Sequence, residues 1–197
     1  MSNTALLLIG FQNDYFSQEG ILSDFIEDML HELNVLQNTL NLIHDLPESV
    51  AIISNPIVFS ELYEELEDPV GILKSIKELG AFKRNTFGAE EVPEFQSIGE
   101  RIVRMEGKHG LNAFINTDLE TYLRTNNIEK IMLAGCVCSI CIDSTGRSAY
   151  DKGFEVYMLS DCITGRTMFE QNFYCNEVFP LYSEVITSKE LLHERLP

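Results

Sequence analysis

The sequence predicts an α/β fold, a three-layer doubly wound arrangement with helices on both faces of a parallel sheet. One observation behind this prediction is a set of short apolar runs, such as residues 4–9, whose lack of alternation is typical of strands buried on both faces. The other is that segments with helical spacing of apolar residues separate these runs along the chain. Strands that alternate with helices favour a parallel sheet covered on both sides.

Six apolar runs are predicted as strands, and the first is stopped by Gly10. They cover residues 4–9, 50–54, 101–105, 128–135, 154–159 and 185–187. Ser23 or Asp24 can cap the first predicted helix, which continues to Asp45, and Glu27 completes a capping box with Asp24. Residues 81–99 are predicted as a long ordered loop. The other predicted helices cover residues 60–66, 70–79, 117–123, 142–152 and 166–181, with a last one capped by Ser188.

Composition limits the class of protein. With 197 residues, of which 45% are hydrophobic and 23% charged, the chain fits one globular domain over residues 1–197. The formal charge of −17 disfavours nucleic acid and anionic membrane surfaces as partners. No apolar run is long enough to span a bilayer, and five cysteines without a secretory signal indicate reduced thiols in a cytoplasmic protein.

Three cysteines lie together in residues 134–141, AGCVCSIC, between a predicted strand and a predicted helix. Cys141 is expected in the first turn of that helix, where the helix dipole and unpaired amides favour a reactive thiolate. The alternative is that Cys136, Cys138 and Cys141 are small buried apolar side chains. Gly10, Lys108 and Cys141 each follow a predicted strand. Because ligands of parallel sheets bind beyond the carboxyl ends of strands, these three positions are site candidates.

Three ordered blocks of sequence resemble the isochorismatase-like cysteine hydrolases, the family that includes nicotinamidases and other small-amide hydrolases. The first block, residues 8–15 (LIGFQNDY), corresponds to a family pattern of a buried strand followed by Asp-x-Gln-Asn-Asp-Phe. The second is Lys108 with residues 109–119 (HGLNAFINTDL), and the third is residues 135–149, with Cys141 at the catalytic cysteine. The blocks span nearly the whole chain at compatible spacing, so the resemblance is specific.

The resemblance implies a sheet order of 3-2-1-4-5-6 and an Asp–Lys–Cys triad. In that chemistry the cysteine, here Cys141, attacks a carbonyl, and the aspartate takes and returns the proton. The lysine, here Lys108, orients the aspartate and favours the thiolate. By position, the resemblance also implies a non-proline cis bond between Cys136 and Val137 and an oxyanion hole formed by the N–H groups of Val137 and Cys141.

The family aspartate is missing, because Gly10 occupies its position and residues 12–14 (QND) fix the alignment. General acid–base catalysis typically contributes about 10²–10⁴-fold, so amide hydrolysis is expected to suffer. Asp14 is expected to be structural. The other candidates for a replacement are side chains that flank Lys108, which are expected to face away from the cleft, and carboxylates in the 81–99 loop, which could reach it. They are Glu106, His109, Glu90 and Glu91.

No cofactor and no metal are expected. Residues 55–57 (NPI) stand where nicotinamidase-type members carry an Asp-x-His pair, and the predicted first and last helices contain His31, His44 and His193. The expected partners are a small-molecule substrate and further copies of the chain, as a homodimer or larger homo-oligomer. The pocket walls are predicted from side chains near the site together with the 81–99 loop. They are Phe11, Tyr15, Phe16, Phe114 and Cys138.

Three functions remain open from the sequence. The first is a cysteine hydrolase with an altered triad that acts on a small amide or acyl compound. The second is a catalytically impaired family member that serves in binding or assembly. The third is dithiol–disulfide exchange, because Cys138 and Cys141 form a C-x-x-C at a helix N-terminus.

Overall fold

The sheet at the centre of the molecule has six strands, and every pair of neighbouring strands is parallel. The computed structural model describes residues 3–194. The strand order β3-β2-β1-β4-β5-β6 confirms both the predicted fold class and the predicted order. The strands are β1 Thr4–Ile9, β2 Ala51–Asn55, β3 Ile102–Arg104, β4 Lys130–Cys136, β5 Glu155–Thr164 and β6 Glu184–Ile186.

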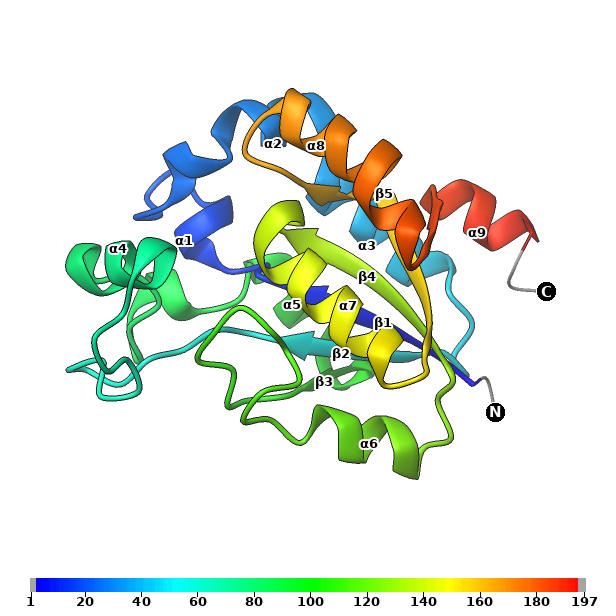
Figure 1. Cartoon of the computed structure of the whole chain (residues 1–197), viewed down its shortest axis with the longest axis horizontal. Coiled ribbons are helices and arrows are strands. Elements are labelled where there is room, and N and C mark those ends of the chain that lie inside the picture. Colours follow the sequence, from blue (N-terminus) through cyan, green and yellow to red (C-terminus); the bar gives the residue numbers. More distant parts are fainter. Residues whose placement is uncertain (1–2, 195–197) are drawn as a thin grey trace.

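Helices occupy the segments between the strands and lie on both sides of the sheet (Figure 1). The α-helices are α1 Asn13–Phe16, α2 Glu27–Leu33, α3 Val35–Asp45, α4 Gly71–Leu79, α5 Pro93–Ile98, α6 Leu119–Thr125, α7 Asp143–Asp151, α8 Met168–Phe173 and α9 Ser188–Glu194. Two π-helical turns, η4 Cys138–Ile142 and η5 Tyr174–Val178, adjoin α7 and α8. Short 3₁₀ helices are η1 Ser23–Phe25, η2 Phe87–Ala89, η3 Gly99–Arg101 and η6 Phe179–Leu181. Within residues 3–194, no helix is long and apolar enough to cross a membrane.

The apolar residues form three buried clusters that correspond to three places in the fold. One face of the sheet, which includes Leu7 of β1, packs against α6 and α7. The opposite face, which includes Leu6, packs against α3, α5 and α9. The third cluster lies beyond the carboxyl end of β4 and joins Val137 to Tyr15 of α1 and Ile76 of α4, at the left of Figure 1. This third cluster holds the candidate site.

The prediction of one helix over residues 24–45 is wrong. The chain instead forms η1, α2 and α3, and Asn34 between α2 and α3 has a left-handed φ of 50°. The expected capping box is not made, because the residue that precedes α2 is Ile26 and no side chain caps the helix. Asparagine tolerates the left-handed conformation, so the break leaves the apolar spacing intact and the sequence pattern does not reveal it.

Other differences are local. Residues 60–66 form turns rather than a helix, and the Glu65 carboxylate accepts hydrogen bonds from the Ser60 N–H and hydroxyl. The predicted loop 81–99 contains η2 and α5, and the predicted helix 166–181 divides into α8, η5 and η6. The cap of α9 is Thr187 rather than Ser188, since Thr187 Oγ1 accepts from the Glu190 N–H and Glu190 accepts from the Thr187 N–H.

Candidate active site

Cys141 lies in the π-helical turn η4, directly after β4, and it is half-buried. Its sulfur accepts a hydrogen bond from Lys108 Nζ at 3.6 Å. Lys108 is only 1% exposed, so its ammonium group has been removed from water and depends on a polar partner in the protein. The structure therefore brings together two of the residues selected from sequence, although they are separated by the whole of α6 and β4.

The position of Lys108 follows from an extension of the sheet. After β2 and β3 end, the two chains continue side by side, with a parallel bridge between Ile57 and Lys108 and a hydrogen bond from the Val58 N–H to the Lys108 carbonyl. The loop that follows is tied to α7, because Thr145 Oγ1 accepts a hydrogen bond from the Ala113 N–H at 3.0 Å. Since α7 continues from the turn that carries Cys141, one bond couples the lysine loop to the cysteine turn.

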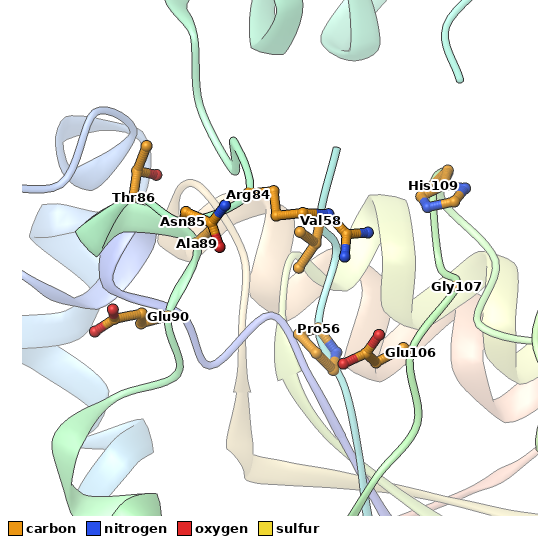
Figure 2. A pocket seen from close by; sticks show the side chains of 10 residues that line it. All are labelled: Pro56, Val58, Arg84, Asn85, Thr86, Ala89, Glu90, Glu106, Gly107 and His109. Atoms are coloured by element: carbon orange, nitrogen blue, oxygen red, sulfur yellow. The ribbon is translucent and has the colours of Figure 1, made fainter. Parts of the chain in front are cut away.

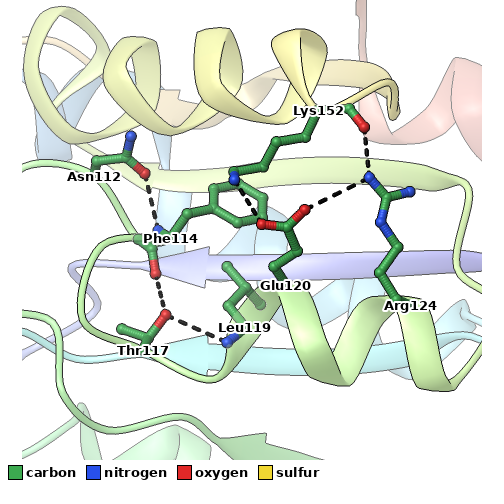
Figure 3. Close-up of polar contacts among 8 residues, drawn as sticks. Asn112, Phe114, Thr117, Leu119, Glu120, Arg124 and Lys152 are labelled. Atoms are coloured by element: carbon green, nitrogen blue, oxygen red, sulfur yellow. Dashed lines mark hydrogen bonds and ion pairs between the residues drawn. The ribbon is translucent and has the colours of Figure 1, made fainter.

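A polar network secures the rest of that loop to α6 and to the end of α7 (Figure 3). Asn112 Oδ1 accepts from the Phe114 N–H, and Thr117 Oγ1 both donates to the Ala113 carbonyl and accepts from the Leu119 N–H. A second group of contacts joins α6 to the end of α7. The Glu120 carboxylate pairs with Lys152 and Arg124, and the Arg124 guanidinium donates a hydrogen bond to the Lys152 carbonyl. The hydrogen bond from Lys152 and its positive charge lower the pKa of Glu120, which serves here as an ion-pair partner of Lys152 and Arg124.

Gly10 lies at the end of β1 with a left-handed φ of 75°, a conformation that favours glycine. A Cβ atom placed on Gly10 would lie 2.9 Å from both the carbonyl oxygen and the sulfur of Cys136. The Cys136 thiol donates a hydrogen bond to the Gly10 carbonyl at 3.3 Å. The backbone at position 10 and the thiol at position 136 are thus packed together, and a side chain at position 10 requires a shift of the surrounding backbone.

The Cys136–Val137 peptide bond is cis. After it, the Val137 carbonyl accepts hydrogen bonds from the N–H groups of Ile140 and Ile142, which sets the path of the turn that leads to Cys141. The cis bond and the turn place the backbone of Val137 and Cys141 in one short segment at the carboxyl end of β4.

The cavity that contains Cys141 is small and mostly apolar. Its volume is about 10 Å³, roughly the space that one water molecule needs. Among its lining residues within 3–194 there is no aspartate, glutamate or histidine. The lining residues are Gly10, Tyr15, Ile57, Ile72, Ile76, Phe82, Lys108, Leu111, Cys136, Ile140 and Cys141.

Residues 12–14 hold the segments around this cavity in place. Gln12 donates to the carbonyls of Ile57 and Ala89 and accepts from the Ile57 N–H, and Asn13 donates to the Phe87 carbonyl. The Asp14 carboxylate accepts from the N–H groups of Ile21 and Phe82. These bonds fit the structural role expected for Asp14, because both of its oxygens serve the backbone.

Of the side chains predicted by name as pocket walls, only Tyr15 lines the Cys141 cavity, and Phe82 of the predicted 81–99 wall loop lines it too. Phe11 packs against Phe95 and Phe16 on the α5 face of the sheet. Phe114 stacks on Phe154 on the opposite face, and Cys138 is fully buried in the same cluster as Phe114. The sequence places these side chains near the motif, but strand and helix geometry turns them toward the core.

The three thiols of the cysteine-rich turn occupy different environments. Burial raises the pKa of Cys136 well above its usual range, with the Cys141 sulfur adding to this effect and Lys108 opposing it. Burial and then the Glu170 carboxylate raise the pKa of Cys138. Both thiols therefore stay protonated near neutral pH, and Cys141 is the one in contact with an ammonium group.

A second and much larger cavity lies on the other side of the Ile57–Lys108 bridge (Figure 2). Its volume is about 560 Å³. Neighbours of the bridge residues line it, as expected when successive residues of extended chains face opposite sides. Its lining residues are Pro56, Val58, Arg84, Asn85, Thr86, Ala89, Glu90, Glu106, Gly107 and His109.

The side chains considered as replacements for a carboxylate at position 10 lie away from Cys141. His109, next to Lys108, lines the larger cavity in agreement with the alternation argument. Glu106, two residues from Lys108, lines the larger cavity although alternation alone would place it on the Lys108 side, and Glu90 lines it too. Glu91 is buried elsewhere, where its carboxylate accepts from the Ser54 hydroxyl and pairs with Arg104. Within residues 3–194 no group of three or more His, Cys, Asp or Glu side chains is arranged to hold a metal ion.

The residues that sequence reasoning missed are the apolar ones that close the cavity. Ile72 and Ile76 come from α4, and the sequence does not predict that this helix covers the site. The helix itself is indicated by its apolar spacing, but nothing in that spacing says which strand ends it covers. The sequence signal that bears on this is a glycine at each end of α4, Gly71 and Gly80, which indicates that the helix is a separate segment. Both glycines have a left-handed φ in the structure.

The fold and the site together define an α/β protein with a lysine–cysteine pair at the carboxyl edge of a parallel sheet. The isochorismatase domain matches residues 4–190, and the chain belongs to the isochorismatase family. The uncharacterized isochorismatase family protein YddQ of Bacillus subtilis (strain 168) is 27% identical over 168 residues, which cover 84% of this chain and 79% of that protein. Its counterpart YecD of Escherichia coli O157:H7 is 31% identical over 86 residues, or 44% of this chain, and the match spans 46% of YecD's length.

Solved structures show the same fold at lower identity. An isochorismatase family protein from Desulfovibrio vulgaris superposes with a TM-score of 0.81 at 18% identity, with 97% of each chain covered. N-carbamoylsarcosine amidase from Thermoplasma acidophilum superposes with a TM-score of 0.73 at 18% identity, covering 95% of this chain and 97% of that one.

Proposed function

We propose that this chain is a cysteine hydrolase that acts on a small amide or acyl compound, with Cys141 as the nucleophile and Lys108 as its electrostatic partner. The observation that carries the proposal is the 3.6 Å contact between Lys108 Nζ and Cys141 Sγ in a buried cavity. A neighbouring ammonium favours the thiolate, which is the nucleophilic form of cysteine. The similarity in fold to N-carbamoylsarcosine amidase supports an amide-like substrate class.

In the proposed reaction, Cys141 attacks the substrate carbonyl, and the resulting acyl thioester is hydrolysed by water. The N–H groups of Val137 and Cys141 are the proposed donors to the oxyanion. Removal of one such donor typically costs about 10²–10³-fold in rate. Gly10 stands where the family pattern has an aspartate, so the proposed site works without a carboxylate on β1.

The proposed substrate can enter the Cys141 cavity only when part of the cavity wall moves. A space of about 10 Å³ holds roughly one water molecule, so we propose that the apolar wall contributed by α4 is displaced on entry. Short segments with exposed backbone open locally at a low free-energy cost. The helix lies at the surface, with Leu79 57% exposed and Val70, next to its start, 81% exposed.

A second candidate function is a family member that binds a small ligand without turning it over. One observation favours it, namely that the wall of the Cys141 cavity contains no carboxylate or imidazole within residues 3–194. In this case Cys141 reacts with alkylating reagents, but acyl compounds are not hydrolysed.

The test compares labelling with turnover. We expect iodoacetamide to modify Cys141 within minutes near neutral pH and to abolish hydrolysis of any substrate in a panel of small amides and esters. Cys141→Ala should lose both properties. Cys138→Ala is the matched control, because its thiol is fully buried in the same turn, and it should retain them.

Rapid labelling of Cys141 without turnover of any compound would favour the binding protein. Slow labelling of Cys141 would contradict the hydrolase. Formation of a Cys138–Cys141 disulfide under mild oxidant, seen as a loss of two free thiols, would instead support the dithiol hypothesis.

We further propose a cytoplasmic homodimer or larger homo-oligomer. The family resemblance supports self-association, and the exposed, mutually stacked rings of Phe169 and Phe173 on α8 offer an apolar contact surface. Light scattering tests this proposal. We expect the unmodified chain to form a dimer or a larger assembly, and Phe169→Glu to shift it toward the monomer. A monomer at all concentrations of the unmodified chain would contradict the proposal.

A further inference from the structure

The Cys141 cavity contains a polar group that the proposed mechanism does not yet use. Of the polar side chains that line it, Lys108 donates to Cys141 and Cys136 donates to the Gly10 carbonyl. The remaining one is Tyr15, whose hydroxyl takes part in no side-chain hydrogen bond formed within residues 3–194. A phenol hydroxyl usually makes a hydrogen bond, so one that makes none in the wall of a cavity is available to a ligand.

Tyr15 is held firmly in the wall. It belongs to α1, is 5% exposed, and its ring packs against Phe82 with the centroids 5.2 Å apart. The preceding residue, Asp14, accepts a hydrogen bond from the N–H of the same Phe82. Asp14 therefore holds both Tyr15 and Phe82 in place, and the Tyr15 hydroxyl has little freedom to turn away from the cavity.

The hydroxyl keeps its proton in the resting site. Burial raises the pKa of Tyr15 well above its usual range, and the sulfurs of Cys136 and Cys141 and the Asp14 carboxylate add to this effect. Tyr15 is therefore protonated throughout the neutral range. Tyr15 and Cys141 line the same cavity.

We propose that the Tyr15 hydroxyl donates the proton to the leaving group when Cys141 is acylated, a role that rests on the proposed hydrolase function. The resemblance gives this role to a carboxylate at position 10, where Gly10 now stands. The family pattern has phenylalanine at position 15, so the hydroxyl is present where the family pattern has none and the carboxylate is absent where the pattern requires it. Both changes concern the wall of one cavity.

The proton and electron count closes over two steps. In the first, the Cys141 thiolate forms a C–S bond, the bond from the carbonyl carbon to the leaving group breaks, and the leaving group takes the Tyr15 proton. In the second, the Tyr15 phenolate takes a proton from water, whose oxygen attacks the thioester. The C–S bond then breaks, and the thiolate and the phenol are both restored. The product carboxylic acid releases its proton to solvent.

Leaving-group dependence tests the proposal. Methyl acetate and p-nitrophenyl acetate deliver the same acetyl group, but only methoxide, a far stronger base than p-nitrophenolate, needs a proton to depart. We expect Tyr15→Phe to lower single-turnover acetylation of Cys141 by methyl acetate by about 10-fold or more, and by p-nitrophenyl acetate by less than about 3-fold. Intact-protein mass spectrometry provides the readout. Tyr150→Phe is the control, because Tyr150 is 54% exposed on α7, and it should change neither rate.

The substitution retains the ring that packs on Phe82, and iodoacetamide labelling of Cys141 reports whether the site remains intact. An equal fall for both esters, or no fall for either, would overturn the role of Tyr15 and leave Lys108 or water as the donor. If the unmodified protein is acetylated by neither ester, the hydrolase function itself fails and the inference fails with it. These outcomes separate the two proposals.

Discussion

Two cavities lie on opposite sides of the bridge between Ile57 and Lys108, and they differ in both size and chemistry. The Cys141 cavity has a volume of about 10 Å³, with apolar walls around a lysine–cysteine pair. The other has a volume of about 560 Å³ and is lined by Arg84, Glu90, Glu106 and His109 among others, but by no cysteine. Charged side chains are thus concentrated in the cavity that no cysteine lines within residues 3–194. Size alone does not select the cavity that holds the thiol, because the reactivity of a thiol depends on its removal from water and on its partner.

The largest effect is expected when the positively charged side chain of the Cys141 cavity is replaced by a neutral one. Lys108→Met keeps the length of the side chain but removes the ammonium 3.6 Å from Cys141 Sγ, and we expect iodoacetamide labelling of Cys141 near neutral pH to slow by about 10–100-fold. The matched variant in the larger cavity is Arg84→Met, which should leave the rate unchanged. An equal effect of both substitutions would mean that the cavities are not electrostatically distinct.

A carboxylate introduced at position 10, directly after β1, should disrupt the small cavity. At Gly10 an aspartate requires a left-handed φ, which costs about 1–3 kcal/mol, and overpacking against Cys136 adds about 1–3 kcal/mol. Gly153→Asp is the control, because φ there is 83° with no atom within 4 Å of the added Cβ. Urea unfolding should show the larger loss for Gly10→Asp. Equal losses would show that the contact with Cys136 relaxes freely.

The apolar wall of the small cavity should contribute to stability as well as to exclusion of solvent. Ile76→Ala on α4 should cost about 2–5 kcal/mol and admit a bulkier reagent, N-phenylmaleimide, to Cys141 faster than in the unmodified protein. Leu79→Ala lies on the same helix but is 57% exposed, and it should be close to neutral. If Ile76→Ala leaves access to Cys141 unchanged, α4 is not the barrier to entry.

The smallest effect is expected from the carboxylate and imidazole of the larger cavity. Glu106→Gln and His109→Gln should each change the stability by less than about 0.5 kcal/mol and the labelling rate of Cys141 by less than about twofold. Both residues flank Lys108 in sequence, so proximity along the chain alone would suggest otherwise. A 10-fold change in labelling would mean that one of these side chains reaches the Cys141 cavity.

Much of the fold could be predicted because its signals are local. Apolar runs bounded by glycine and polar residues locate the strands within a few positions, and β1 is predicted to the residue. The break at Asn34 could not be predicted, since a left-handed asparagine leaves the apolar spacing of α2 and α3 continuous. The N-terminal cap of α9 was misplaced by one position because Thr187 and Ser188 are both good capping residues.

The candidate site was predictable to the extent that it depends on strand ends. Gly10, Lys108 and Cys141 follow β1, β3 and β4, and all three line one cavity. The pocket walls were not predictable in the same way. Phe11, Phe16, Phe114 and Cys138 are close in sequence to the motifs, yet the alternation of faces along each segment directs them into the core or toward other surfaces.

By itself, the sequence determined the parallel sheet and the positions of Lys108 and Cys141 after strands of that sheet. Hydrophobic periodicity and turn residues act over a few positions at a time, so they can be read from the sequence. Tertiary structure decided which groups share a cavity with the cysteine, because α1 and α4 come from distant parts of the chain and close over the strand ends only when the apolar cluster around Tyr15, Ile76 and Val137 forms. Tertiary structure also decided that the Cys136 thiol fills the space beside Gly10. This contact depends on backbone conformation, which the residue pattern does not predict.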